Sequence, residues 1–67
     1  MTWTYVCKMA IERLAGGRVR AQYGDQIIKV LMAEYPELYL NDMIPEDYQL
    51  MPIINGVLIA YGEEKVE

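Results

Sequence analysis

Residues 50–62 read LMPIINGVLIAYG, and the way this stretch folds decides the fold class of the chain. Asn55-Gly56 lies between two apolar runs that contain β-branched residues, and this dipeptide supplies the positive φ angles of a two-residue hairpin turn. The sequence therefore predicts a β-hairpin with strands at about 50–54 and 57–61. Pro52 has no N–H to donate to a ladder, so the first strand is expected at an edge or to begin there.

The first segment fits two periods. A helix over residues 3–15 would have Thr2 as its N-cap and Gly16-Gly17 as its stop. Residues 2–12 also alternate with the two-residue period of a strand. The glycine stop favours the helix, which places one apolar face on Trp3, Val6, Cys7, Ala10, Ile11 and Leu14.

Two more elements are expected between this segment and the hairpin. Residues 18–23 alternate between apolar and polar side chains, which predicts a short strand with Arg18, Arg20 and Gln22 facing outward. Asp25 is expected to cap a central helix that Pro36 ends, because a residue before proline leaves the helical region. That helix is apolar nearly all round and should form the centre of the core.

The predicted fold class is therefore α+β, as one compact domain covering residues 1–67. The order helix, strand, helix, acidic segment and hairpin is that of a winged helix. If residues 2–12 form a strand instead, the order becomes that of a β-grasp fold. Element order alone assigns no function.

The composition argues against most enzyme chemistry. The chain contains no serine, no histidine and a single cysteine, so neither a Ser-His-Asp triad nor a Cys-His pair can form. One thiol cannot build a zinc site, and the acidic residues lack the spacing of a calcium-binding loop. Cys7 is expected in the core, and Gly16-Gly17 matches no phosphate-binding loop. We expect no catalytic residues, no metal and no cofactor.

The small size predicts a partner chain. A domain of 67 residues has a thin stability margin, and no internal disulfide can form here. A homodimer or a stable complex with another protein is therefore expected. Candidate contacts are the Pro52-containing edge strand and the region around Tyr5 and Met9. No signal peptide or membrane-spanning run is visible, and the free thiol suggests the cytoplasm.

Charge separates the two halves of the chain. Residues 1–33 carry five basic and two acidic side chains, whereas residues 34–67 carry one basic and eight acidic, for a total of −4. Residues 34–48 combine five carboxylates with three tyrosines and no lysine or arginine, which is typical of a surface that binds a basic protein. The predicted partner-binding residues are Glu37, Tyr39, Asp42, Glu46, Asp47 and Tyr48.

The predicted function is a small acidic protein-binding module, acting as an inhibitor or adaptor of the same type as viral inhibitors that mimic DNA. The bland interpretation is that these acids are merely solvated and that the tyrosines are half-buried edges of the core. The alternative function is a winged-helix-like DNA-binding regulator that uses Arg18 and Arg20 on phosphates. Nucleic acid is not the expected partner, because the acidic segment would repel it.

Overall fold

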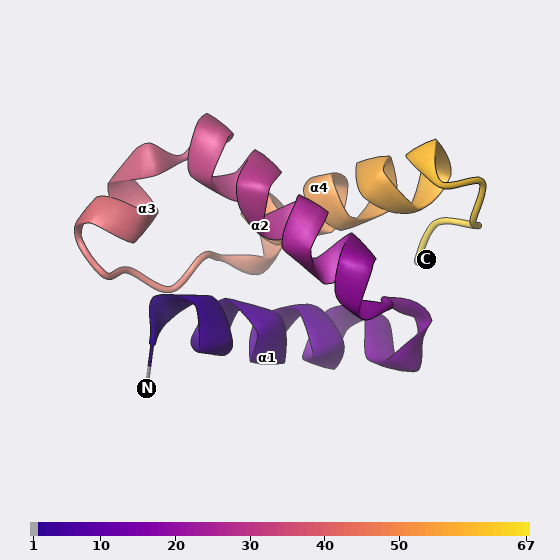
Figure 1. The fold of residues 1–67 in the computed structure, drawn as a ribbon, viewed down its shortest axis with the longest axis horizontal. Helices are drawn as coiled ribbons and strands as arrows, with labels where there is room; N and C mark the ends of the chain where they lie inside the picture. The colour runs from indigo at the N-terminus through magenta and orange to yellow at the C-terminus, as the bar shows by residue number, and fades with distance from the viewer. Residues whose placement is uncertain (1) are drawn as a thin grey trace.

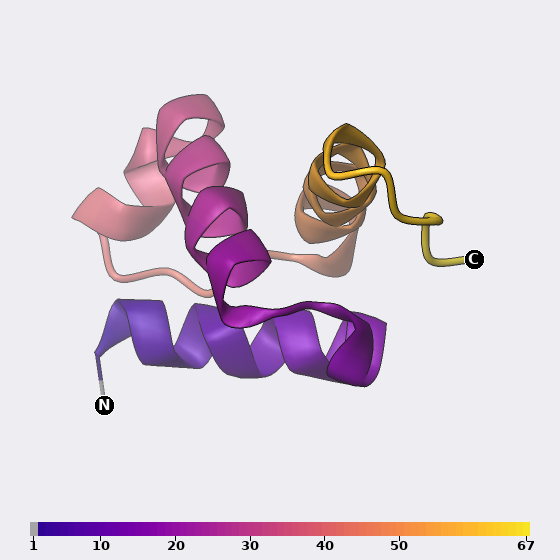
Figure 2. The same ribbon diagram turned by 45° about the vertical axis from the view of Figure 1, so that its right-hand side comes forward.

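The computed structural model describes residues 2–67, and all regular structure in this range is helical. The elements are α1 (Trp3–Ala15), a 3-10 turn η1 (Gly16–Arg18), α2 (Ala21–Glu34), the short α3 (Pro36–Leu40) and α4 (Asp47–Ala60). Helix α1 runs beneath α2 and α4, while α3 and the loop that follows it form one end of the molecule (Figure 1). Turned by 45°, α2 and α4 stand side by side on the same side of α1 (Figure 2). The α+β class, in both its winged-helix and β-grasp forms, is therefore wrong.

The predicted hairpin is helix α4. Its buried residues follow the i, i+3, i+4, i+7, i+8 spacing of one helical face: Leu50, Ile53, Ile54, Val57 and Leu58. A capping box starts the helix, in which the Glu46 side chain accepts from the backbone N–H of Gln49 and the Gln49 side chain accepts from that of Glu46. The helical spacing of apolar residues and the capping-box residues can both be read from the sequence. They favour a helix, whereas Asn55-Gly56 favours a hairpin turn.

Burial decides this competition. Five buried apolar side chains, of which Leu50, Ile54 and Leu58 are fully buried, contribute about 7–15 kcal/mol, at about 1.5–3 kcal/mol each. A two-residue period would turn Leu50 and Ile54 to one side and Ile53 to the other, so a hairpin could not bury all five. Gly56 and Pro52 cost the helix about 1 and 3 kcal/mol. The proline removes a bond to the carbonyl of Tyr48, which is an exposed residue.

Asn55, predicted to turn a hairpin, instead holds the end of the chain. Its side-chain nitrogen donates to the Val66 carbonyl at 3.2 Å, and the Val66 N–H donates to its oxygen at 2.6 Å. The amide thus bonds both backbone groups of Val66, as a neighbouring strand would. This pairing keeps Val66 packed against the core.

Replacing Gly56 by alanine tests the helical assignment directly. The glycine lies in the interior of α4 without a positive φ, and a Cβ there would meet no atom within 4 Å. We expect Gly56→Ala to raise the free energy of unfolding by about 0.5–1 kcal/mol, measured by urea denaturation, because it removes glycine from a helix. A hairpin turn with positive φ at residue 56 would give the opposite sign.

Helix α1 confirms the helical prediction for the first segment. The Thr2 hydroxyl accepts from the Tyr5 N–H at 3.1 Å, and Gly16 ends the helix at a φ of 63°. Glycine reaches this conformation without the penalty that a Cβ imposes. The face buries Trp3, Cys7, Ile11 and Ala15, with Val6, Ala10 and Leu14 partly covered.

The strand predicted for residues 18–23 is wrong. Arg18 ends η1, Arg20 is the N-cap of α2, and Ala21–Tyr23 begin that helix, so Asp25 lies within α2 rather than capping it. The helical spacing of Tyr23, Ile27 and Leu31 extends the buried face upstream of the predicted start. Gly24 does not break the helix; it is buried next to Val19. The predicted end holds, with Pro36 directly after the C-cap Tyr35.

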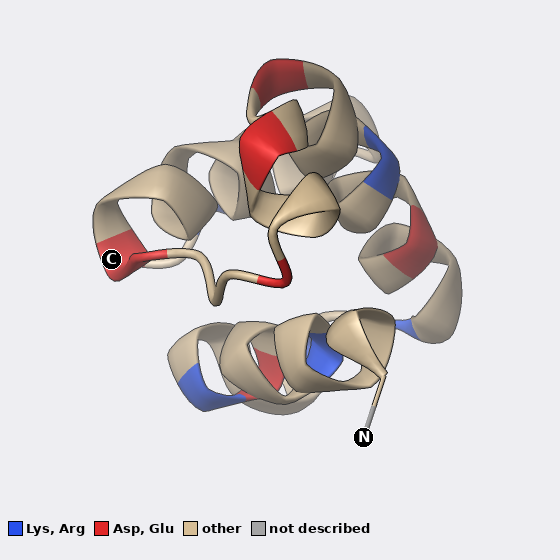
Figure 3. Cartoon of the chain, turned by 90° about the vertical axis from the view of Figure 1, so that its left-hand side faces the viewer, with Lys and Arg blue, Asp and Glu red and all other residues tan. Residues whose placement is uncertain are grey.

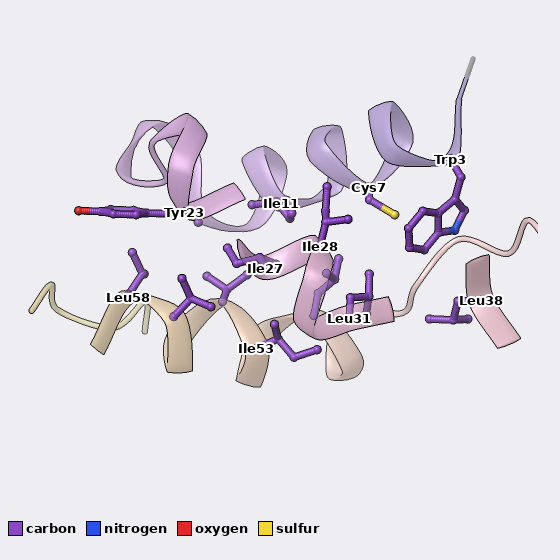
Figure 4. Close-up of a cluster of buried hydrophobic side chains, with 14 residues drawn as sticks. Trp3, Cys7, Ile11, Tyr23, Ile27, Ile28, Leu31, Leu38, Ile53 and Leu58 are labelled. Carbon is purple, nitrogen blue, oxygen red and sulfur yellow. The ribbon is translucent and has the colours of Figure 1, made fainter. Parts of the chain in front are cut away.

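The core lies between α1, α2 and α4. Cys7 and Ile11 of α1 point toward Ile28 of α2, and Ile53 and Leu58 extend the cluster from α4 (Figure 4). The accessible surface of 4464 Å² matches the roughly 4,400 Å² expected for a compact monomer of 7.8 kDa. The radius of gyration, 10.9 Å, likewise matches the value of about 11 Å expected for this length.

Candidate functional site

The acidic segment forms α3 and a well-anchored loop that leads into α4. Asn41 ends α3, and its side chain donates to the Glu37 carbonyl at 2.9 Å. Asp42 follows with a φ of 54°, a conformation that aspartate tolerates better than most residues. The Met43 N–H then returns to the Leu38 carbonyl at 2.8 Å. These bonds give the loop after α3 a defined backbone.

Trp3 anchors this loop to α1. The indole N–H donates to the Met43 carbonyl at 2.8 Å across 40 residues of sequence. The Tyr39 ring meets the Trp3 ring edge-on, with centroids 5.2 Å apart and an interplanar angle of 77°. Leu38 and Pro45 are buried on either side of the turn. The loop is therefore fixed to the body of the domain at both of its ends.

Four large apolar side chains on this anchored segment face solvent. Tyr39, Leu40, Met43 and Ile44 expose between 49% and 76% of their surface. Acidic residues lie over α3 and this loop on the same end of the molecule (Figure 3). We define the docking patch as the set Glu37, Tyr39, Leu40, Asp42, Met43 and Ile44. It combines exposed apolar area with negative charge on a backbone that is held in place.

The six predicted site residues divide between this patch and the start of α4. Glu37, Tyr39 and Asp42 belong to the patch and are exposed. Glu46 caps α4, and Asp47 accepts a hydrogen bond from Arg13 at 2.7 Å. Tyr48 is exposed on the first turn of α4. The structure therefore gives Glu46 and Asp47 local roles in joining α4 to the rest of the domain.

The Arg13–Asp47 pair is exposed on both sides. The hydrogen bond from Arg13 lowers the pKa of the Asp47 carboxyl, and the same bond raises the pKa of Arg13. A carboxyl with a lowered pKa in the folded state stabilises the fold above its unfolded pKa and loses that contribution as the pH falls through the folded value. Because both groups are solvated, the contribution is small and decreases with salt.

Three of the six basic side chains, Lys8, Arg13 and Arg18, bond to partners within the chain. Lys8 pairs with Asp25 at 3.0 Å, and the Arg18 guanidinium donates to the carbonyls of Glu64 and Lys65. The DNA-binding alternative placed Arg18 and Arg20 together on the outer side of a strand, and that strand is absent from residues 2–67. No hairpin wing is present in this range either. The winged-helix argument for DNA binding therefore loses its structural basis.

Cys7 is the one cysteine of the chain, and it is buried. Burial raises the pKa of the Cys7 thiol to about 11, which keeps it protonated near neutral pH. Among residues 2–67, no three His, Cys, Asp or Glu side chains gather closely enough to hold a metal ion. A cavity of about 320 Å³ beside η1 is lined by Lys8 and Arg20, but Glu12 lines it too and Lys8 is paired. No helix in the described part of the chain is long and apolar enough to cross a membrane.

Three residues of the docking patch were missed by sequence reasoning: Leu40, Met43 and Ile44. The prediction followed the carboxylates and tyrosines and took no account of these apolar side chains. The sequence feature that could have indicated their exposure is the presence of the turn-forming residues Asn41, Asp42 and Pro45 next to them.

Comparison of the chain with models of protein families, with curated proteins and with solved structures finds no match.

Proposed function

We propose that this protein is a small acidic, non-enzymatic protein-binding module whose docking patch binds a basic partner protein. The observation that carries the proposal is the exposure of Tyr39, Leu40, Met43 and Ile44 on an anchored backbone. A contiguous group of exposed apolar residues rimmed by polar ones marks interaction sites more often than it occurs by chance. Interfaces commonly combine such an apolar centre with a polar rim.

The negative charge of this region favours a partner with a basic surface. No lysine or arginine occurs between Lys29 and Lys65, and within residues 2–67 the ion pairs involve Asp25 and Asp47 rather than Glu34, Glu37 or Asp42. A complementary partner presents lysine or arginine around an apolar recess. An inhibitor or adaptor of the DNA-mimic type would occupy a surface that otherwise binds nucleic acid, and duplex DNA would then compete with it.

Preorganisation also favours docking. An exposed apolar loop that is mobile loses conformational entropy when it binds, which reduces affinity. Here the Trp3 indole, the Asn41 side chain and the Met43 N–H fix the loop in the unbound protein. The patch can therefore contribute apolar burial without a large ordering cost.

Serine substitutions at Leu40 and Ile44 test the patch. We expect the double variant Leu40→Ser/Ile44→Ser to fold normally and to bind the partner at least about tenfold more weakly, since apolar anchors at the centre of an interface dominate affinity. The measurement compares host proteins retained by immobilised wild type with those retained by the variant, followed by titration of the recovered partner. Tyr5→Ser/Met9→Ser is the matched control, because these α1 residues are about half exposed and lie outside the patch.

A charge variant separates the contribution of the carboxylates to binding from that of the apolar side chains. Glu37→Gln/Asp42→Asn removes two rim charges, and asparagine keeps a residue that tolerates the positive φ of position 42. We expect slower association and a weaker dependence on salt, with little change in dissociation. If the serine and charge variants both bind like wild type, or the α1 control alone loses the partner, the patch is not the binding surface.

A further inference from the structure

A second surface of the molecule is lined by residues that do not belong to the docking patch. A groove of about 340 Å³ runs between α2 and α4 on their outer side. Two rows with four-residue spacing line it: Gln26, Val30 and Glu34 from α2, and Pro52, Gly56 and Ala60 from α4. The buried residues Ile53 and Val57 lie between the rows.

Helix α4 is the least polar part of the chain, and only one of its sides is covered. Residues 48–61 contain no charged side chain, whereas the chain as a whole has a net charge of −4. A helix that is apolar nearly all round is typically covered on all sides. Here α1 and α2 cover the face that contains Ile54, while Pro52, Gly56 and Ile59 remain exposed on the opposite side.

Charge favours a second copy as the occupant. Two chains of equal net charge repel where their carboxylates meet, so charge opposes self-association least at an uncharged face such as that of α4. We propose that the chain forms a two-fold symmetric dimer through this α4 face, with the two α4 helices antiparallel and crossing at Gly56. This arrangement sets Pro52 of each copy against Ala60 of the other, since both residues are four positions from the crossing point.

The geometry of the monomer fits this arrangement. A Cβ at position 56 would meet no atom within 4 Å, so the crossing point is open and two helices can approach closely there. Helices α2 and α4 run in opposite directions (Figure 1), which places Glu34 at the Pro52 end of the groove. The two-fold axis then sets the two Glu34 carboxylates at opposite ends of the interface, and the antiparallel helix dipoles attract each other.

The available area is sufficient for a weak dimer. A stable interface buries about 800 Å² on each partner, which is about a fifth of the 4464 Å² surface of this chain. One long face of a molecule with extents of 32 × 21 × 20 Å is roughly that share. An interface without charged anchors is therefore expected to have a dissociation constant in the micromolar range.

Gly56→Arg separates folding from association, because it should not lower the melting temperature of the monomer but should lower the association constant of the dimer. Arginine is a better helix former than glycine and finds open space in the monomer, so the melting temperature at about 1 µM should not fall. In the dimer the two guanidinium groups would meet at the crossing point, and we expect the association constant to drop at least about thirtyfold. Ala60→Arg, at another exposed groove residue, should also weaken association, and it replaces Gly56→Arg if that variant fails to fold.

Sedimentation velocity from about 1 to 300 µM measures these constants for wild type, Gly56→Arg, Ala60→Arg and the control Met9→Arg. Met9 is an exposed apolar residue on α1, so the control adds the same charge elsewhere and should stay within about threefold of wild type. Salt gives an independent readout: it should strengthen this dimer by screening repulsion, whereas it should weaken binding of a basic partner at the docking patch. A wild type that remains monomeric at about 300 µM overturns the proposal. Association that survives Gly56→Arg but not Met9→Arg also overturns it.

Discussion

Replacing Ile54 by alanine should cost about 2–5 kcal/mol of unfolding free energy, which is a large part of the total for this domain. Ile54 is fully buried in the centre of α4, and its truncation removes transfer free energy and leaves a cavity. A domain of 67 residues has about 3–10 kcal/mol in all. We expect the variant to be largely unfolded at 37 °C, as measured by circular dichroism and urea denaturation.

Ile59→Ala is the matched control for this prediction. The same side chain is truncated on the same helix, but Ile59 is 59% exposed on the opposite side of α4. Its cost should stay within about 0.5 kcal/mol when measured at about 1 µM, where any dimer is dissociated. Equal costs at the two positions would contradict the helical phase of α4, because a hairpin that turns at Asn55-Gly56 would place Ile54 and Ile59 on the same face, whereas the helix buries Ile54 and exposes Ile59.

Trp3→Ala should be similarly damaging, at about 3–5 kcal/mol, and its effect should reach the docking patch. The ring fills the end of the core beside Tyr39, and its N–H holds the loop at Met43. Truncation therefore removes both the packing and the anchor. Urea denaturation gives the cost, which should be large enough to leave the domain partly unfolded at 25 °C.

Trp3→Phe separates the two contributions of Trp3. Phenylalanine keeps most of the apolar area and loses the indole donor, so the cost should be only about 1–2 kcal/mol. In this folded variant, the amide signals of residues 41–44 and of Glu46 should broaden or shift in NMR spectra, while those of α2 stay unchanged. A loop unaffected by Trp3→Phe would show that the hydrogen bond to Met43 does not hold the docking patch in place.

The parts of this fold that could be predicted from sequence are those where local and tertiary signals agree. Thr2 and Gly16 bound an apolar stripe at helical spacing, so α1 and its buried Cys7 were predicted correctly. Pro36 likewise ended α2 as expected. In both helices the cap or stop residues and the buried face specify the same structure, and packing reinforces what the backbone prefers.

The errors fall where a local signal opposes burial. Asn55-Gly56 is a strong turn signal, but it concerns two residues, whereas the helical phase of α4 buries five. The alternation of Val19, Ala21 and Tyr23 covers too few residues to distinguish a strand from a helix start, and Ala21 is in fact exposed. For the candidate site, the charge pattern indicated the correct segment. Which of its apolar residues face solvent depends on the hydrogen bond from Trp3 to Met43, 40 residues away in the sequence.

The buried thiol of Cys7 makes it possible to measure how often the folded domain opens. A reagent that attacks thiolates reaches this sulfur only when α1 separates from α2 and α4, because Cys7 is fully covered and its pKa is about 11. Where opening and reclosing are fast, the ratio of its reaction rate to that of an unfolded chain is the fraction of time spent open, and each 1.4 kcal/mol of stability slows the reaction tenfold. With a single cysteine in the chain, every modified molecule records one such opening event, so rare openings of this domain can be measured without denaturant.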